Sequence, residues 1–132
     1  MDETKTVSAK PSPKSGFRRF GPAFRHSVVG LRATFKTEAA FQQEILGFLI
    51  LVPVALWLGE SNTERVLLIG PLFLVLIVEL LNSAVESAVD RWGNDYNEFT
   101  KAAKDAGSAA VFISLLLVVF VWVMLLVIPV VL

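Results

Sequence analysis

The stretch 65-RVLLIGPLFLVLIVELLNSAVESAV-89 decides the fold, because it is long and apolar enough to cross a bilayer. A spanning helix needs about 20 predominantly apolar residues. The first half of this stretch is strongly apolar after Arg65. Its second half also carries polar side chains, and an aspartate follows it directly: Glu79, Asn82, Ser83, Glu86, Ser87 and Asp90. We predict a membrane-spanning helix over residues 65–89.

Two further apolar segments flank this stretch. Residues 45–58 are too few to span, so the helix must start near residue 39, which brings three polar residues into it. We expect Pro53 to kink that helix. The third segment is residues 108–131, and the small residues 107–110 at its start suit close helix packing. A polar turn over 59–64 and a polar connection over 91–104 join the three predicted spans.

The segment before the first span has the pattern of an amphipathic helix. Apolar residues recur at steps of three and four, and basic residues follow along one flank. Pro22 suits the first turn of such a helix. We interpret residues 17–37 as a helix lying in the membrane interface; the alternative is an amphipathic helix that packs on protein. Residues 1–16 are polar and are predicted to be a disordered tail.

Composition and the distribution of charge exclude some classes of function and predict the orientation of the chain in the membrane. The 132 residues are 55% hydrophobic with a mean hydropathy of +0.65, and the absence of cysteine excludes disulfides and thiol catalysis. Eight of the twelve Lys and Arg precede residue 37. We interpret this basic N-terminal segment as facing anionic lipid, and we expect no nucleic-acid partner. The distribution of basic residues predicts a cytoplasmic N-terminus and a C-terminus on the opposite side.

The polar residues of the second predicted span carry the strongest functional signal. At 100° per residue, four of them fall within an arc of about 80° on one helix face, along about 16 Å. We call these four residues the ladder: Glu79, Asn82, Glu86 and Asp90. Carboxylates at membrane depth usually mark a functional site. Glu79 and Glu86 repel each other unless a proton or cation intervenes, and Arg19, Lys104 or a metal ion could supply that charge.

Other polar groups lie near the predicted ends of the spans. Glu38 and Glu44 stand at the start of the first span and are within reach of the ladder if the helices pack that way. The connection after Gly93 matches no Walker A loop and no protein-kinase motif. Its plain interpretation is a hydrophilic connector.

At these residues the chain resembles the small prokaryotic diacylglycerol kinases, which are membrane-embedded lipid kinases. The resemblance covers residue 17 to the end. It rests on the blocks G30-L-R-A33, E38-A-A-F-x-Q-E44, R65-V-L-L68, I77-V-E-x-L-N-S-A-x-E-x-x-V-D-R91 and A103-K-D-x-G-S-A-A-V111. It implies a homotrimer with active sites shared between protomers, and transfer of the ATP γ-phosphate to diacylglycerol, giving phosphatidic acid. The bacterial inner membrane is the implied location.

The resemblance also implies a role for particular residues. Glu79 would be the general base, and Asn82, the second catalytic residue, would orient Glu79 or a phosphate. Glu38 and Glu86 would bind Mg²⁺. The implied ATP-binding residues are Arg19, His26, Glu38, Glu86, Asp95, Tyr96, Asn97, Lys104 and Asp105. The implied lipid-binding residues are Arg19, Arg32, Glu44, Trp57, Glu79 and Ser108.

Three other functions compete with this interpretation. A polyprenol kinase of the same architecture would phosphorylate undecaprenol instead. A small proton- or cation-coupled transporter would use Glu79 and Glu86 as relay groups. A packing subunit would have no catalytic role. The Lys104-Asp105 pair favours a kinase, because neither the transporter nor the packing subunit needs a phosphate-binding group there.

Overall fold

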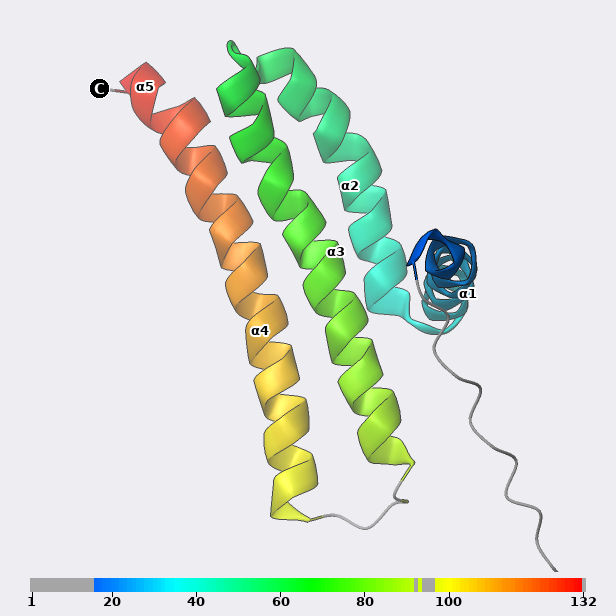
Figure 1. The fold of residues 1–132 in the computed structure, drawn as a ribbon. Helices are drawn as coiled ribbons and strands as arrows, with labels where there is room; N and C mark the ends of the chain where they lie inside the picture. Colours follow the sequence, from blue (N-terminus) through cyan, green and yellow to red (C-terminus); the bar gives the residue numbers. More distant parts are fainter. Residues whose placement is uncertain (1–15, 92, 94–96, 132) are drawn as a thin grey trace, which may run out of the picture.

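The computed structural model describes residues 16–91, 93 and 97–131. Regular structure in these residues is entirely helical: a 3₁₀ turn η1 (Gly16–Arg19), α1 (Phe20–Thr37), α2 (Ala39–Leu58), α3 (Asn62–Asp90), α4 (Glu98–Trp122), a π-helical turn η2 (Val123–Val127) and α5 (Ile128–Val131). The helices α2 and α3, and the continuous helix from α4 to α5, are long and apolar enough to cross a membrane (Figure 1). The predicted class, three spanning helices preceded by an N-terminal helix, is confirmed.

Helix α3 lies between α2 and α4 and supplies most of the core (Figure 1). Its buried residues Leu68, Leu72 and Val75 recur at steps of four and three, as one helix face requires. The indole nitrogen of Trp122 on α4 donates a hydrogen bond to the Leu68 carbonyl over 3.1 Å. Most other apolar side chains of the three helices face outward, which suits lipid or another protein chain.

The turn between α2 and α3 is tightly capped. The Ser61 hydroxyl accepts a hydrogen bond from the Glu64 amide over 3.1 Å, and the Glu64 carboxylate accepts one from the Glu60 amide over 2.9 Å. This arrangement resembles a capping box at the start of α3. A Cβ atom at Gly59 would lie 2.6 Å from Cγ of Arg65, so the turn requires glycine there. The capping explains why α3 starts at Asn62, three residues before the predicted span at 65–89.

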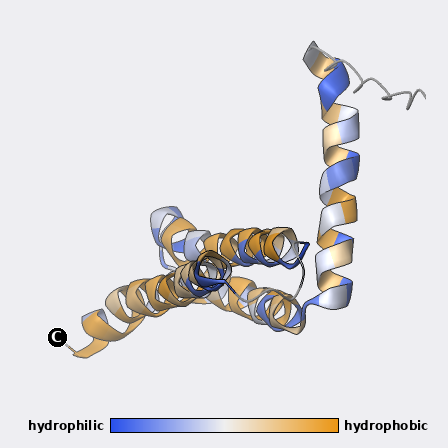
Figure 2. Cartoon of the chain, turned by 90° about the horizontal axis from the view of Figure 1, so that it is seen from below, coloured by the Kyte–Doolittle hydropathy of each residue, from blue (hydrophilic) through white to orange (hydrophobic). Residues whose placement is uncertain are grey.

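Helix α1 lies across the spanning helices rather than alongside them (Figures 1 and 2). Glu38, in an extended conformation, separates α1 from α2, and the Gln42 side chain donates to the Phe35 carbonyl over 2.7 Å to fix the corner. Pro22 is in the first turn of α1. The helix alternates polar and apolar turns in Figure 2, and Phe20 and Phe24 are largely exposed. This orientation suits a helix lying in a membrane interface.

Helix α4 begins ten residues before the predicted span at 108–131, so residues 98–107 are helical rather than part of a connecting loop. The Asn97 side chain caps the helix by accepting a hydrogen bond from the Thr100 amide over 2.8 Å. Lys101 and Asp105 form an ion pair one turn apart on the same helix. The apolar pattern does not reveal this polar first part of α4, because capping and ion pairing stabilise it instead.

Candidate active site

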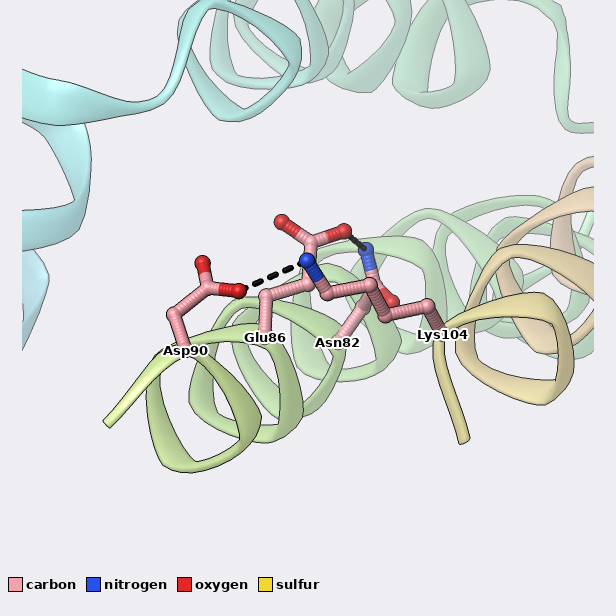
Figure 3. A network of polar contacts seen from close by, with 4 residues as sticks. All are labelled: Asn82, Glu86, Asp90 and Lys104. Atoms are coloured by element: carbon pink, nitrogen blue, oxygen red, sulfur yellow. Dashed lines mark hydrogen bonds and ion pairs between the residues drawn. The ribbon is translucent and has the colours of Figure 1, made fainter. Parts of the chain in front are cut away.

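The ladder follows one face of α3 from the interior of the bundle to its end. Glu79 is 4% exposed, Asn82 and Glu86 are half-buried, and Asp90 is exposed. The Asn82 side-chain amide donates to Oε1 of Glu86 over 3.2 Å (Figure 3). The amide oxygen of Asn82 is buried and has no hydrogen-bond partner among the described residues. The ladder therefore runs from the buried carboxylate of Glu79 to the exposed carboxylate of Asp90, with one hydrogen bond, between Asn82 and Glu86, inside it.

Helix α4 contributes a cation to the exposed end of the ladder. Nζ of Lys104 donates to Oδ1 of Asp90 over 2.6 Å (Figure 3). Glu86 also attracts Lys104 electrostatically. A lysine ammonium has three donors, and Asp90 takes one of them, so Lys104 keeps the capacity to bind an anion. The spacing of the ladder alone gave no indication of this Asp90 contact, because it depends on how α4 packs against α3.

Three other carboxylates lie around Glu79. Glu86 on the same helix, Glu38 at the start of α2 and Glu44 on α2 all lie close enough to interact electrostatically with it. One oxygen of Glu44 is buried without a hydrogen-bond partner in the part of the chain that the structure describes. Neighbouring carboxylates cannot all carry charge without a cation or proton among them. Such an arrangement can accept a proton or attract a cation.

A groove of about 480 Å³ runs between α2, α3 and α4 and ends at the carboxylates. Glu44 and Glu79 are its charged lining residues. Its remaining walls are mostly apolar: Gly47, Phe48, Leu51, Leu72, Val75, Val111, Leu115 and Val118. Ligand sites typically combine such apolar walls with a few polar groups. The groove therefore suits a long alkyl chain whose polar end lies beside Glu79.

A second cavity, of about 340 Å³, separates α1 from α3. Small residues of α1, including Gly30 and Ala33, line it together with the buried Ser83 of α3 and with Glu38. The Ser83 hydroxyl is buried without a hydrogen-bond partner among the described residues. Ser83 was part of the polar half of the span in the sequence, but no role was predicted for it.

The structure does not bring every predicted site residue to the ladder. Among the described residues, Arg19, His26 and Arg32 are exposed on η1 and α1 and form no hydrogen bond or ion pair with it. Trp57 is exposed at the other end of α2, and Ser108 is exposed on α4. The remaining nucleotide candidates lie around the start of α4: Asn97 caps the helix, Asp105 pairs with Lys101, and Asp95 and Tyr96 lie outside the described residues.

The donor chemistry around the ladder fits magnesium bound together with a nucleotide. The described residues contain no group of three or more His, Cys, Asp or Glu side chains placed to hold a metal ion by themselves. Mg²⁺ usually takes only one or two protein carboxylates and completes its shell with phosphate oxygens and water. Glu38 and Glu86, which both interact electrostatically with Glu79, are two carboxylates that could take this part.

Fold and site together define a small helical membrane protein with a carboxylate cluster at one end of its spans. The model of the prokaryotic diacylglycerol kinase family matches residues 25–126. Similar proteins named diacylglycerol kinase come from Escherichia coli (strain K12), 48% identical over 112 residues, and Pseudomonas aeruginosa, 44% identical over 115 residues. These alignments cover 85% of this chain and 92% and 94% of the two relatives. A Helicobacter pylori relative (strain J99) of the same name is 37% identical over 112 residues. The chain belongs to the prokaryotic diacylglycerol kinase family.

Proposed function

We propose that this protein transfers the γ-phosphate of ATP to the free hydroxyl of diacylglycerol and so makes phosphatidic acid. One observation supports this most directly: the buried carboxylate of Glu79 stands where an apolar groove meets a set of charged groups. A lipid alcohol needs an apolar channel for its chains and a proton acceptor at its hydroxyl. The proposal agrees with the name that the relatives carry.

In the proposed reaction Glu79 is the general base. The lipid hydroxyl oxygen forms a bond to the γ-phosphorus, and the bond from that phosphorus to the β–γ bridging oxygen breaks. The hydroxyl proton passes to Glu79, and ADP leaves. Asn82 and Glu86 are hydrogen-bonded to each other and continue the polar face of α3 from Glu79 toward its exposed end, the side on which the proton would later be released.

Charged groups at the exposed end of the ladder would bind the nucleotide. Lys104 would contact the phosphates, and Asp105 with the 95–97 segment would hold the rest of ATP. Glu38 and Glu86 would hold Mg²⁺, whose charge offsets that of the phosphate oxygens when the nucleotide is bound. Arg19 and His26 would join this site only through a movement of the first helix or from another copy of the chain. Both residues are exposed, so they are free to reach a site on another copy of the chain or to move with the first helix.

The assembly and location are part of the proposal. We infer a homotrimer in the bacterial inner membrane, with residues 17–132 as the lipid kinase domain and residues 1–16 as a tail outside it. The outward-facing apolar side chains of α4, such as Phe112 and Phe120, provide surface for contact with lipid or with another copy. The excess of basic residues before residue 37 supports a cytoplasmic N-terminus. The ladder then faces cytoplasmic ATP.

The test is phosphoryl transfer from radiolabelled Mg·ATP by purified protein in lipid vesicles. Diacylglycerol and undecaprenol are supplied separately, and Glu79→Gln is the control. Labelled phosphatidic acid that the control does not form would support the proposed function. Label on undecaprenol alone would replace the substrate and keep the mechanism. Label on neither lipid would contradict a kinase and favour a transporter that uses the same carboxylates.

A further inference from the structure

Gly107 on α4 faces the Asn82 side chain on α3. A Cβ atom added at Gly107 would lie 2.2 Å from Oδ1 of Asn82 and 3.3 Å from its Cγ. No carbon and oxygen atom approach so closely without a covalent bond. The other helical glycines that the structure describes (Gly21, Gly30, Gly47 and Gly70) would place a Cβ with no atom within 4 Å. The space beside Gly107 is therefore already filled by the Asn82 amide.

This contact fixes which way the Asn82 amide points. Its oxygen lies against Gly107, while its nitrogen donates to Oε1 of Glu86 over 3.2 Å. The oxygen is buried and has no hydrogen-bond partner among the described residues, so close packing against α4 is what holds it in place. A side chain at position 107 would displace this oxygen first. The Cα atom of Asn82 would be 3.9 Å away, which is an ordinary contact.

We propose that Gly107 is a positioning residue for the ladder. Its missing side chain gives the Asn82 amide the one place from which the nitrogen reaches Glu86. The effect of this positioning on turnover rests on the proposed function, in which Glu86 binds Mg²⁺. The contact between Gly107 and Asn82 does not depend on that function and can be measured separately.

A positioning role and a purely structural role predict different outcomes for Gly107→Ala. Alanine favours a helix more than glycine does, and the atom it would meet is at the end of a flexible side chain. The variant should therefore fold and remain as heat-stable as the parent. If Gly107 served only to let the helices approach, a folded variant would also be fully active. If it positions Asn82, the folded variant loses activity.

The first measurement uses the side-chain amide signals of the protein in detergent micelles, labelled with ¹⁵N-asparagine. The chain has four asparagines, and the Asn82 signals are identified by their loss in Asn82→Ala. We expect Gly107→Ala to shift the Asn82 signals and leave the other three in place. Gly70→Ala is the matched control and should shift none of the four. Unchanged Asn82 signals in folded Gly107→Ala would overturn the proposal, whatever the activity of the protein.

The second measurement is a double-mutant cycle on phosphoryl transfer. Loss of a partner that orients a metal ligand commonly costs about 10-fold or more. We expect Gly107→Ala to lower kcat by that amount or to raise the Mg²⁺ concentration needed for half the maximal rate. In the Asn82→Ala background the same change should have no further effect, because no amide remains to displace. Equal losses in both backgrounds would overturn the positioning role. A parent protein without kinase activity would contradict the proposed function while the amide signals still report on the contact.

Discussion

Lys104 and Asp90 join the two helices that carry the site, through a hydrogen bond of 2.6 Å between Nζ and Oδ1. The residues are fourteen positions apart, on either side of the connection between α3 and α4. Both side chains remain partly exposed, so solvent screens the pair and it adds little to stability. Its main effect is on where the lysine charge lies relative to Glu86.

Replacement of Asp90 tests that effect. Asp90→Asn removes the charge that holds Lys104, and we expect the KM for ATP to rise about two- to fivefold, the change that a partly exposed ion pair allows. Asp90→Glu keeps the charge and should retain most of the affinity. The measurement is a titration of ATP at saturating lipid. A fall in KM would instead mean that Asp90 competes with the phosphates for the lysine.

Replacement of Glu79 tests the general base. Glu79→Gln keeps the size of the side chain and removes the proton acceptor, so turnover should fall about 100-fold to 10,000-fold. Nucleotide binding, measured by equilibrium dialysis with labelled ATP, should persist. Glu64→Gln, at the other end of α3, can still accept the hydrogen bond from the Glu60 amide and should be fully active. Substantial turnover by Glu79→Gln would rule out Glu79 as the base.

Replacement of Glu38 or Glu86 tests the metal ligands. Each change to glutamine removes one carboxylate from the cluster, and we expect the Mg²⁺ concentration for half-maximal rate to rise about 10-fold or more. The rate should recover in part when Mg²⁺ is raised. The measurement is activity against free Mg²⁺ at constant Mg·ATP. An unchanged titration curve in both variants would argue against both assignments.

Replacement of Trp122 tests packing without touching the ladder. Trp122→Phe keeps the aromatic ring and loses the hydrogen bond to the Leu68 carbonyl, so stability should fall by about 0.5–1.5 kcal/mol. The free energy of unfolding can be followed by denaturant titration in mixed micelles. Trp57→Phe is the control, because Trp57 is 81% exposed. A loss of the same size in both variants would show that the hydrogen bond is not the cause.

The absence of cysteine makes the orientation directly measurable. We expect a single cysteine at Glu60, in the turn between α2 and α3, to react with a membrane-impermeant maleimide in intact spheroplasts. A cysteine at Lys101 should react only after lysis. Both positions are exposed, so accessibility within the protein is not limiting. The reverse labelling pattern would place the ladder on the outer side of the membrane, where the protein could not use cytoplasmic ATP.

The sequence predicts the parts of this molecule that depend on periodicity along one chain segment. The apolar segments give the three spanning helices, and steps of three and four place Glu79, Asn82 and Glu86 on one face of α3. The helical residues 98–107 were not predicted, because a cap at Asn97 and a local ion pair stabilise them. The sequence indicated close packing at Gly107 and a cation at Lys104, but it did not predict their partners, Asn82 and Asp90. They depend on the rotation and height of α4 relative to α3, and no pattern within a single helix encodes these.

The length of α2 ties the site to the thickness of the membrane. Its 20 residues rise about 30 Å, close to the thickness of the hydrocarbon, and α1 lies across one end of it. Helix α3, with 29 residues, has length to spare and can tilt. In a thicker bilayer α2 would be too short, and Glu38 would be drawn toward hydrocarbon while Glu86 on α3 would not follow it. The two proposed metal ligands would then lie at different depths in the membrane. The catalytic rate should therefore depend on the thickness of the bilayer.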